Sequence, residues 1–167
     1  YCVSAPEQLA HINEHMDLNF IQTADIDLAS YNGGKWVPIG GFGNPDNYSQ
    51  PKEFAGKYCG DGYEIRNLYI EFNDPDQNSC HAGLFAWVNG ENSLVSDLTV
   101  RVAGANLICY NYPDFGAIAS TLDGGTIRDC DVIIEGDVVT SVTEGGASPN
   151  GDVGGIVATA WAYGGTG

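Results

Sequence analysis

The sequence has few basic residues. Only 6 of its 167 residues are Lys or Arg, against 22 Asp or Glu, and the formal net charge at pH 7 is −16. A chain with this charge repels polyanions, so nucleic acid is not an expected partner. We interpret the acidic excess as the solubilising surface of a secreted protein, because exposed acidic groups keep a folded domain in solution.

Long apolar stretches are also missing. No run of eighteen apolar residues is present, so the sequence predicts no membrane-spanning helix. The chain does not open with a basic segment followed by an apolar stretch, as a signal peptide would. Its last segment, residues 164–167, repeats the Gly-Gly-Thr of residues 124–126. We therefore expect a longer protein, with further repeats after residue 167 and with the signal and surface anchor outside this sequence.

The five cysteines include no Cys-x-x-Cys pair, which removes the usual sequence signatures of zinc sites and redox-active thiols. Cys130 aligns with leucines of other repeats, so we expect a buried thiol that packs as a small hydrophobic residue. The other four, Cys2, Cys59, Cys80 and Cys109, could form disulfides in an oxidising compartment. Cys80 and Cys109 precede equivalent blocks and are candidates for pairing, although spacing alone does not give connectivity.

Two short blocks recur along the chain in the same order. The first spans residues 61–70 and returns at 91–100 and 123–132, which aligns Ile65, Val95 and Ile127 at intervals of 30 and 32 residues. The second is a Gly followed by two apolar residues and Ala, at residues 83–86, 116–119 and 155–158. Periods of about 20 to 50 residues are typical of solenoids, whose units bury their apolar faces on one another.

Within each unit the apolar residues alternate with more polar ones, as they do in a β-strand. Leu68, Ile70 and Phe72 show this alternation, and residues 98–102 and 130–134 repeat it. No helical spacing of ten or more residues lies between the blocks, which argues against solenoids that have a helix in each unit. The sequence therefore predicts an all-β fold built as a stack of β-coils.

The second block contains the core Gly83-Leu84-Phe85, followed by Ala86. Together with residues 7–13, 36–40, 54–56 and 62–68, this core resembles the repeats of the bacterial GLUG-motif family, whose Gly-Leu-aromatic core ends in a second glycine. The resemblance covers most of the chain. It implies a right-handed parallel β-helix within a large secreted or surface-attached protein that is often adhesin-like. Some members of that family are IgA-cleaving metallopeptidases, in which the repeats are not the catalytic part.

A short α-helix is expected before the first coil. Ser4 and Glu7 have the spacing of a capping box, and the helix should extend to about Met16. Leu9, Ile12 and Met16 would share an apolar face that covers the open end of the first coil, as the caps of solenoids do. We expect one β-helix domain over residues 1–167, with the cap and first coil in 1–53 and the GLUG-like repeats in 54–167.

The same helix contains a candidate zinc motif. Residues 11–15 spell the His-x-x-Glu-His of inverted zinc metallopeptidases, in which two histidines bind zinc and the glutamate acts as base. At about 100° per residue, His11, Glu14 and His15 lie opposite the apolar face and should be exposed to solvent. No neighbouring helix is expected to bring a third ligand, so we favour a plain surface helix over a catalytic zinc site.

An acidic loop offers a second metal candidate. Asp74, Asp76 and Asn78 place side-chain oxygens at alternating positions, as the start of a calcium-binding loop does. Ser79 and Phe85 stand where an EF-hand would have its glycine and its glutamate. We favour an acidic turn, with weak Ca²⁺ binding as the alternative, and expect no other cofactor.

No set of side chains in the sequence converges on a catalytic site. The expected function is a non-catalytic extracellular repeat module on a bacterial surface, for presentation or for adhesion to a host protein or glycan. Exposed aromatic residues would form its ligand surface. The candidates are Trp87, Tyr110, Tyr112 and Trp161, although each could instead pack on a neighbouring loop.

A polysaccharide-degrading enzyme is the main alternative, because pectate lyases and polygalacturonases are also parallel β-helices. A lyase needs a Lys or Arg base, and a hydrolase needs two carboxyl groups that face each other across the sugar bond. The few basic residues are scattered along the sequence. A third interpretation is the non-catalytic repeat region of a secreted peptidase.

The repeat alignment makes two structural predictions. Glu71 and Arg101 occupy equivalent outward positions of successive units, so stacked strands about 4.8 Å apart should place them side by side as an exposed salt bridge. No segment resembling the N-terminal helix follows the last unit. We therefore expect Ile156 and Val157 to lie at an uncovered end of the stack, and residues from Asp152 onward to fray.

Overall fold

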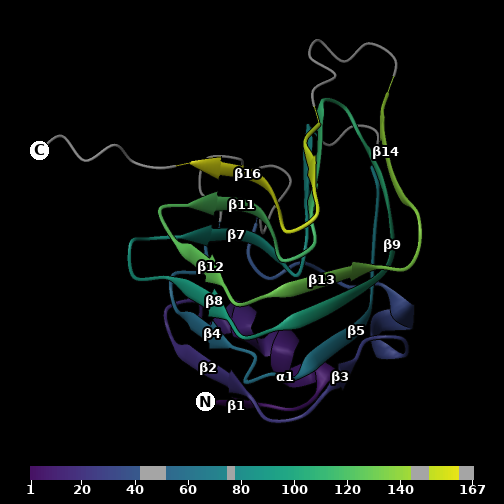
Figure 1. Cartoon of the computed structure of the whole chain (residues 1–167). Coiled ribbons are helices and arrows are strands. Elements are labelled where there is room, and N and C mark those ends of the chain that lie inside the picture. The colour runs from purple at the N-terminus through teal and green to yellow at the C-terminus, as the bar shows by residue number, and fades with distance from the viewer. Residues whose placement is uncertain (42–51, 75–77, 144–150, 162–167) are drawn as a thin grey trace, which may run out of the picture.

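The computed structural model describes residues 1–41, 52–74, 78–143 and 151–161. The described chain forms a parallel β-solenoid of about four turns, with one short α-helix near the N-terminus. This confirms the predicted β-helix with an N-terminal helix. Figure 1 shows the coils stacked from the N-terminal end upward, with the last strand, β16 (Val157–Trp161), near the other end of the stack.

Four parallel sheets run along the stack. The first contains, in order, β1 (Cys2–Val3), β2 (Asn19–Gln22), β4 (Lys57–Cys59), β8 (Leu94–Ser96) and β12 (Thr126–Arg128). The second contains β3 (Ile26–Asp27), β5 (Glu64–Asn73), β9 (Thr99–Cys109) and β13 (Asp131–Ile134), with β14 (Val138–Val142) paired to the later half of β9. The third contains β6 (Ser79–Ala82), β10 (Tyr112–Gly116) and β15 (Val153–Gly154), and the fourth contains β7 (Phe85–Asn89), β11 (Ala119–Asp123) and β16.

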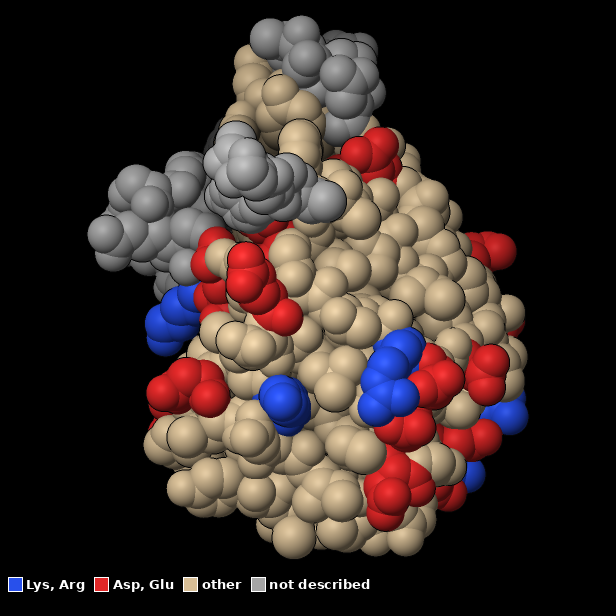
Figure 2. All heavy atoms as spheres, turned by 60° about the vertical axis from the view of Figure 1, so that its left-hand side comes forward, with Lys and Arg blue, Asp and Glu red and all other residues tan. Residues whose placement is uncertain are grey.

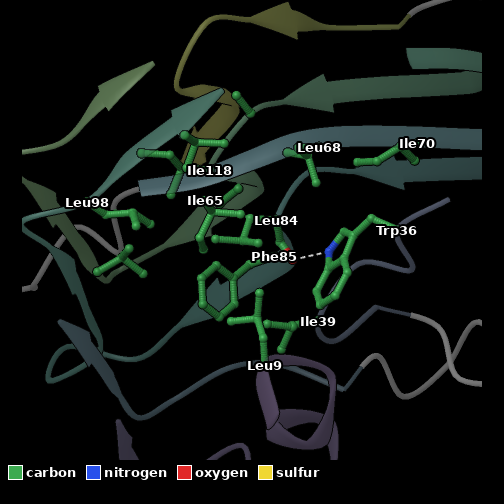
Figure 3. Close-up of a cluster of buried hydrophobic side chains, with 14 of the residues drawn as sticks. Leu9, Trp36, Ile39, Ile65, Leu68, Ile70, Leu84, Phe85, Leu98 and Ile118 are labelled. Carbon is green, nitrogen blue, oxygen red and sulfur yellow. Dashed lines mark hydrogen bonds between the residues drawn. The ribbon is translucent and has the colours of Figure 1, made fainter. Parts of the chain in front are cut away.

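Inward side chains of successive coils pack in columns because the strands are in parallel register. Ile65 of β5 pairs with Val100 of β9, and both are fully buried. Figure 3 shows how Ile39, Leu84 and Phe85 gather in the centre of the stack, and how the Trp36 indole donates to the Leu84 carbonyl at 3.1 Å. Burial of each large apolar side chain contributes about 1.5 to 3 kcal/mol, so these columns supply most of the driving force for folding.

The chain turns sharply from the third sheet into the fourth at a column of glycines. Gly83 and Gly116 lie at this bend in two successive coils, and Gly154 pairs with Gly116 in the next. A Cβ atom on Gly83 would clash with the Gly116 carbonyl oxygen, and one on Gly154 would clash with the Val157 carbonyl oxygen. The glycine of the repeated block is therefore required by the close approach of backbone at this corner.

The N-terminal cap differs in detail from the prediction. The α-helix α1 (Pro6–Ala10) is followed by a 3₁₀-helix, η1 (His11–Glu14), so the α-helix does not reach Met16. The predicted capping box is wrong, because Gln8 and not Glu7 reaches back, with its Oε1 accepting from the Ser4 backbone N–H at 2.8 Å. The apolar face is confirmed: Leu9 and Ile12 are fully buried against the core.

The predicted strand register of the first repeat is wrong. Val95 pairs with Ile127, as predicted, but its partner in the preceding coil is Tyr58 and not Ile65. The bulge at Leu68 shifts the pairing of β5 with β9 further. In the second block, Gly116 pairs with Gly154 and not with the predicted Gly155. Insertions between the repeats change the length of each coil, and a fixed sequence period cannot follow them.

The predicted salt bridge between Glu71 and Arg101 is therefore wrong. Glu71 binds Lys35 at 2.6 Å, and its partner across the ladder is Asn106. Arg101 bridges two other carboxylates, Glu64 at 3.0 Å and Glu135 at 2.9 Å. Each of the three positions lies in a different coil, so Arg101 links the strands above and below its own.

The five cysteines are free thiols. Cys80 and Cys109 are both buried in adjacent coils, and the contact between the two thiols raises the pKa of Cys80 and lowers the pKa of Cys109. The two cysteines predicted as candidates for pairing are therefore neighbours in space, although no disulfide joins them in this structure. Cys130 is half-buried rather than buried, and it packs against the edge of the core.

Candidate functional site: a hollow at the outer corner of the coils

The bend at the glycine column makes a concave corner on the outer surface. A hollow of about 310 Å³ lies there, between the outward faces of the third and fourth sheets. We call it the corner hollow. It is lined by His81, Trp87, Tyr112, Asp114, Thr121, Asp152, Thr159 and Trp161.

One side of the corner hollow is a column of ionisable residues from the third sheet. His81 and Asp114 are register partners in β6 and β10. Asp152 precedes β15 and continues the column, because the next pair along the ladder is Phe115 with Val153. The strands alternate, so the flanking residues Ala82 and Phe115 point inward and are fully buried.

The other side is a column from the fourth sheet. Thr121 of β11 pairs with Trp87 of β7 on one edge and with Thr159 of β16 on the other. Trp161 follows two residues after Thr159 and therefore points to the same outer face. The two columns belong to sheets that meet at the glycines, so they face each other across the corner.

Burial governs the chemistry of His81. It lowers the pKa of the imidazole to about 4, so the ring is neutral at pH 7. The Trp87 ring lies 5.5 Å from it, centre to centre. Ser120 Oγ and Asp114 Oδ2 both approach the same ring nitrogen, Nδ1, at 3.4 Å and 3.5 Å. A Ser-His-Asp relay uses opposite ring nitrogens, so this arrangement is not a nucleophilic triad.

Two carboxylates of the hollow lie in unlike surroundings. Burial raises the pKa of Asp114, and the negative charge of Asp152 adds to the effect, while a bond from the Asp152 backbone N–H to Asp114 Oδ1 at 2.9 Å opposes it. Asp152 is exposed, and its Oδ2 accepts from Thr159 Oγ1 at 3.0 Å. The pair thus combines the carboxyl group of Asp114, whose pKa is raised, with that of Asp152, which is exposed to solvent.

Three of the four aromatic residues predicted for a ligand surface line the corner hollow. Trp87 is half-buried, while Tyr112 and Trp161 remain 37% and 64% exposed. Tyr110 is exposed in the turn between β9 and β10 and does not line the hollow. The structure therefore brings together aromatic residues that lie up to 74 positions apart in the sequence, from Trp87 to Trp161.

The ionisable column was missed in the sequence, although a signal was present. His81 and Asp114 each stand two residues before the glycine that begins a repeated block, and Asp152 stands two residues before Gly154, the register partner of Gly116. An alternating strand places such a residue on the outer face of the bend. The sequence comparison begins this block at its glycine, so it leaves out the polar residues that precede the block.

The zinc candidates come together on the N-terminal cap. His11, Glu14 and His15 are exposed, as predicted, and their ligand atoms lie within 4.8 Å of one another. The predicted calcium ligands Asp74, Asp76 and Asn78 do not form such a cluster among the described residues. Asp76 lies outside the described residues, and Asn78 Oδ1 accepts from Asn111 Nδ2 at 2.6 Å. Within the described ranges, the His11 cluster alone groups three potential metal ligands.

Acidic side chains are spread over the surface. On the face seen in Figure 2 they lie mainly along the border, and a basic side chain lies among several of them. Among the described residues, no helix has the length and apolar character that crossing a membrane requires. No family model, curated protein or solved structure matches this chain.

Proposed function

We propose that the chain is a non-catalytic extracellular repeat module, similar to those of GLUG-motif surface proteins, and that it binds a glycan in the corner hollow. The observation that carries this proposal is the convergence of Trp87, Tyr112 and Trp161 with Asp114 and Asp152 on one concave surface. Small-molecule sites in proteins combine apolar and aromatic linings with a few placed polar groups, in volumes of about 300 to 1,000 Å³. The hollow lies at the lower end of that range.

The lining favours an uncharged sugar. The apolar faces of sugar rings pack on aromatic side chains, and Trp161 is available for this contact because most of its surface is exposed. Sugar hydroxyl groups can donate to Asp152 and Asp114. The described lining contains no Lys or Arg, so a uronic acid would meet two carboxylates without a compensating cation. We accordingly propose a neutral glycan as the ligand.

A binding screen tests this proposal. The purified chain is titrated with neutral and uronate-containing oligosaccharides, and calorimetry gives the affinity of each. We expect saturable binding of a neutral oligosaccharide that weakens at least about tenfold in Trp161→Ala, because exposed aromatic anchors dominate such contacts. Tyr110→Ala is the matched control, since this exposed aromatic residue lies outside the hollow. Binding that is equal in Trp161→Ala and the parent chain would refute the assignment of the hollow.

The two carboxylates favour a second candidate function, hydrolysis of a polysaccharide. Glycoside hydrolases pair a carboxylic acid of raised pKa with an ionised carboxylate. Asp114 has the environment of the acid and Asp152 that of the base or nucleophile. A lyase is less consistent with the hollow, because its described lining offers no Lys or Arg as base.

Release of reducing ends distinguishes the hydrolase from the binding module. The chain is incubated with neutral polysaccharides, and new reducing ends are measured beside Asp114→Asn and Asp152→Asn. Turnover that is lost in both variants would replace the binding module by the hydrolase. Binding without turnover, retained in part by Asp114→Asn, supports the non-catalytic module.

A further inference from the structure

A cluster of metal-ligating side chains lies at the opposite end of the stack from the corner hollow. His11 and Glu14 belong to η1, and His15 is the residue that ends it. The 3₁₀ turn brings all three side chains to one outer face, although His15 itself has left the helical conformation, with φ −142° and ψ 53°. The sequence motif alone predicts an α-helical spacing, which the chain does not have here.

The distances in this cluster fit a small divalent ion. His11 Nδ1 lies 3.3 Å from Glu14 Oε1, and the His11 and His15 rings lie 5.6 Å apart, centre to centre. Zinc bonds to nitrogen and oxygen are about 2.0 to 2.2 Å long, so two ligands of one tetrahedral ion lie about 3.3 to 3.5 Å apart. The His11 and Glu14 atoms already have this separation. The His15 ligand atom lies within 4.8 Å of both, which rotation of an exposed side chain can close.

A second observation concerns the space beside the cluster. A hollow of about 510 Å³ adjoins it and is lined by His11 and His15 themselves, together with Cys2, Glu7 and the rings of Tyr1 and Phe20. Cys2 and Glu7 carry further groups that bind metals, and the open volume leaves room for water on the ion. Three protein ligands beside such a space are typical of a site with a vacant coordination position.

We propose that His11, Glu14 and His15 form a surface site for a divalent transition-metal ion such as Zn²⁺. The site is independent of the proposed glycan binding, and no catalytic role is assigned to it. Imidazole and carboxylate ligands suit Zn²⁺, Ni²⁺ and Cu²⁺, whereas Ca²⁺ requires six or more oxygen ligands, which this cluster does not offer. A bound ion would fix the turn that carries Ile12 into the core and so stabilise the N-terminal cap.

The test titrates the metal-free chain with Zn²⁺, Co²⁺ and Ca²⁺ separately. We expect one equivalent of Zn²⁺ to bind, Co²⁺ to compete and to give the visible spectrum of a nitrogen-ligated ion, and Ca²⁺ to have no effect. His15→Gln should weaken Zn²⁺ binding at least about tenfold, since even loss of a residue that only orients a ligand costs about 10- to 100-fold. The midpoint of thermal unfolding should rise with Zn²⁺ in the parent chain and not in His15→Gln.

Two control variants keep the result specific. Glu7→Gln changes a carboxylate that lines the same hollow but lies outside the three-residue cluster. The affinity of this variant for Zn²⁺ should stay close to that of the parent chain. Cys2→Ser tests whether a thiol holds the ion instead. All these side chains are exposed, so the variants should fold, and circular dichroism checks that they do. Absence of saturable Zn²⁺ binding, or binding that survives His15→Gln and is lost in Cys2→Ser, would overturn the proposal.

Discussion

The two ends of the stack bury the same kind of side chain to different extents. Leu9 and Ile12 of the N-terminal cap are fully buried on the first coils. At the other end, Ile134 is 49% exposed, although its register partner Val102, one coil below, is fully buried. Both strands have apolar residues at the paired positions, Val100 and Val102 in β9 and Val132 and Ile134 in β13. Within the described residues, what differs is whether another layer of chain covers the coil, so burial in this fold is a property of the stack rather than of a single repeat.

Hydrogen exchange gives the largest expected contrast between the ends. Strands β7, β11 and β16 are successive members of one ladder, and within the described residues β16 pairs on one edge only. Opening free energies range from near zero for fraying segments to the global value for the core. We expect the amides of β7 to be more protected than those of β16 by at least about 3 kcal/mol. Equal protection in a dilute monomer would mean that the end of the stack is covered.

Truncation of one apolar side chain at each end gives the next largest contrast. Leu9→Ala should destabilise the chain by about 2 to 5 kcal/mol, because it leaves a cavity between the cap and the core. Ile134→Ala removes a half-exposed side chain from β13, which within the described residues pairs with β9 only, and it should change the free energy of unfolding by less than about 1 kcal/mol. Urea unfolding of both variants measures the difference. Similar losses would contradict the conclusion that, within the described residues, Leu9 is a core residue and Ile134 is not.

The pH dependence of stability tests whether the buried His81 of β6 makes the folded chain sensitive to acid. The pKa of His81 is about 4 when folded against 6.5 unperturbed, so between these values only the unfolded chain binds the proton. Stability contributed by neutral His81 is complete above pH 6.5 and is lost as the pH falls toward 4. The full loss is about 3 kcal/mol. Asp114 acts in the opposite sense, because its raised pKa lets the folded chain keep a proton that the unfolded chain has released.

Comparison of variants isolates the His81 contribution. His81→Gln should flatten the decline in unfolding free energy between pH 7 and pH 4.5, as measured by urea unfolding at each pH. Asp114→Asn retains His81 and should keep the decline. A decline of unchanged size in His81→Gln would assign the acid sensitivity to other groups.

The sequence predicted the fold more closely than the register. The alternation of Leu68, Ile70 and Phe72 is a local property of a strand, and it is confirmed at Leu68 and Ile70, which are fully buried. Coil length is not local, since insertions separate Tyr58 from Val95 by 37 residues but Val95 from Ile127 by 32. A comparison of short blocks finds the residues that match and cannot find which of them stack.

Only part of the candidate site could be predicted from the sequence. Aromatic residues on a strand are recognisable in a sequence, and Trp87, Tyr112 and Trp161 were named from it. Their neighbourhood depends on two different sheets meeting at the glycine bend, which no single repeat encodes. The ligand cluster of the cap was named from its motif, whereas the 3₁₀ geometry that brings His11 and His15 together was not predicted, because it depends on how Ile12 packs on the core.

The glycine column separates what is fixed in this protein from what is free to drift. A side chain at Gly83 or Gly116 would clash with nearby backbone atoms, so a substitution there should destabilise the fold. Exposed positions such as Asp152 and Trp161 point away from the core, so exchange of their side chains should leave the coil intact. Natural selection can therefore change the side chains that line the corner hollow while the bend that shapes it stays constant.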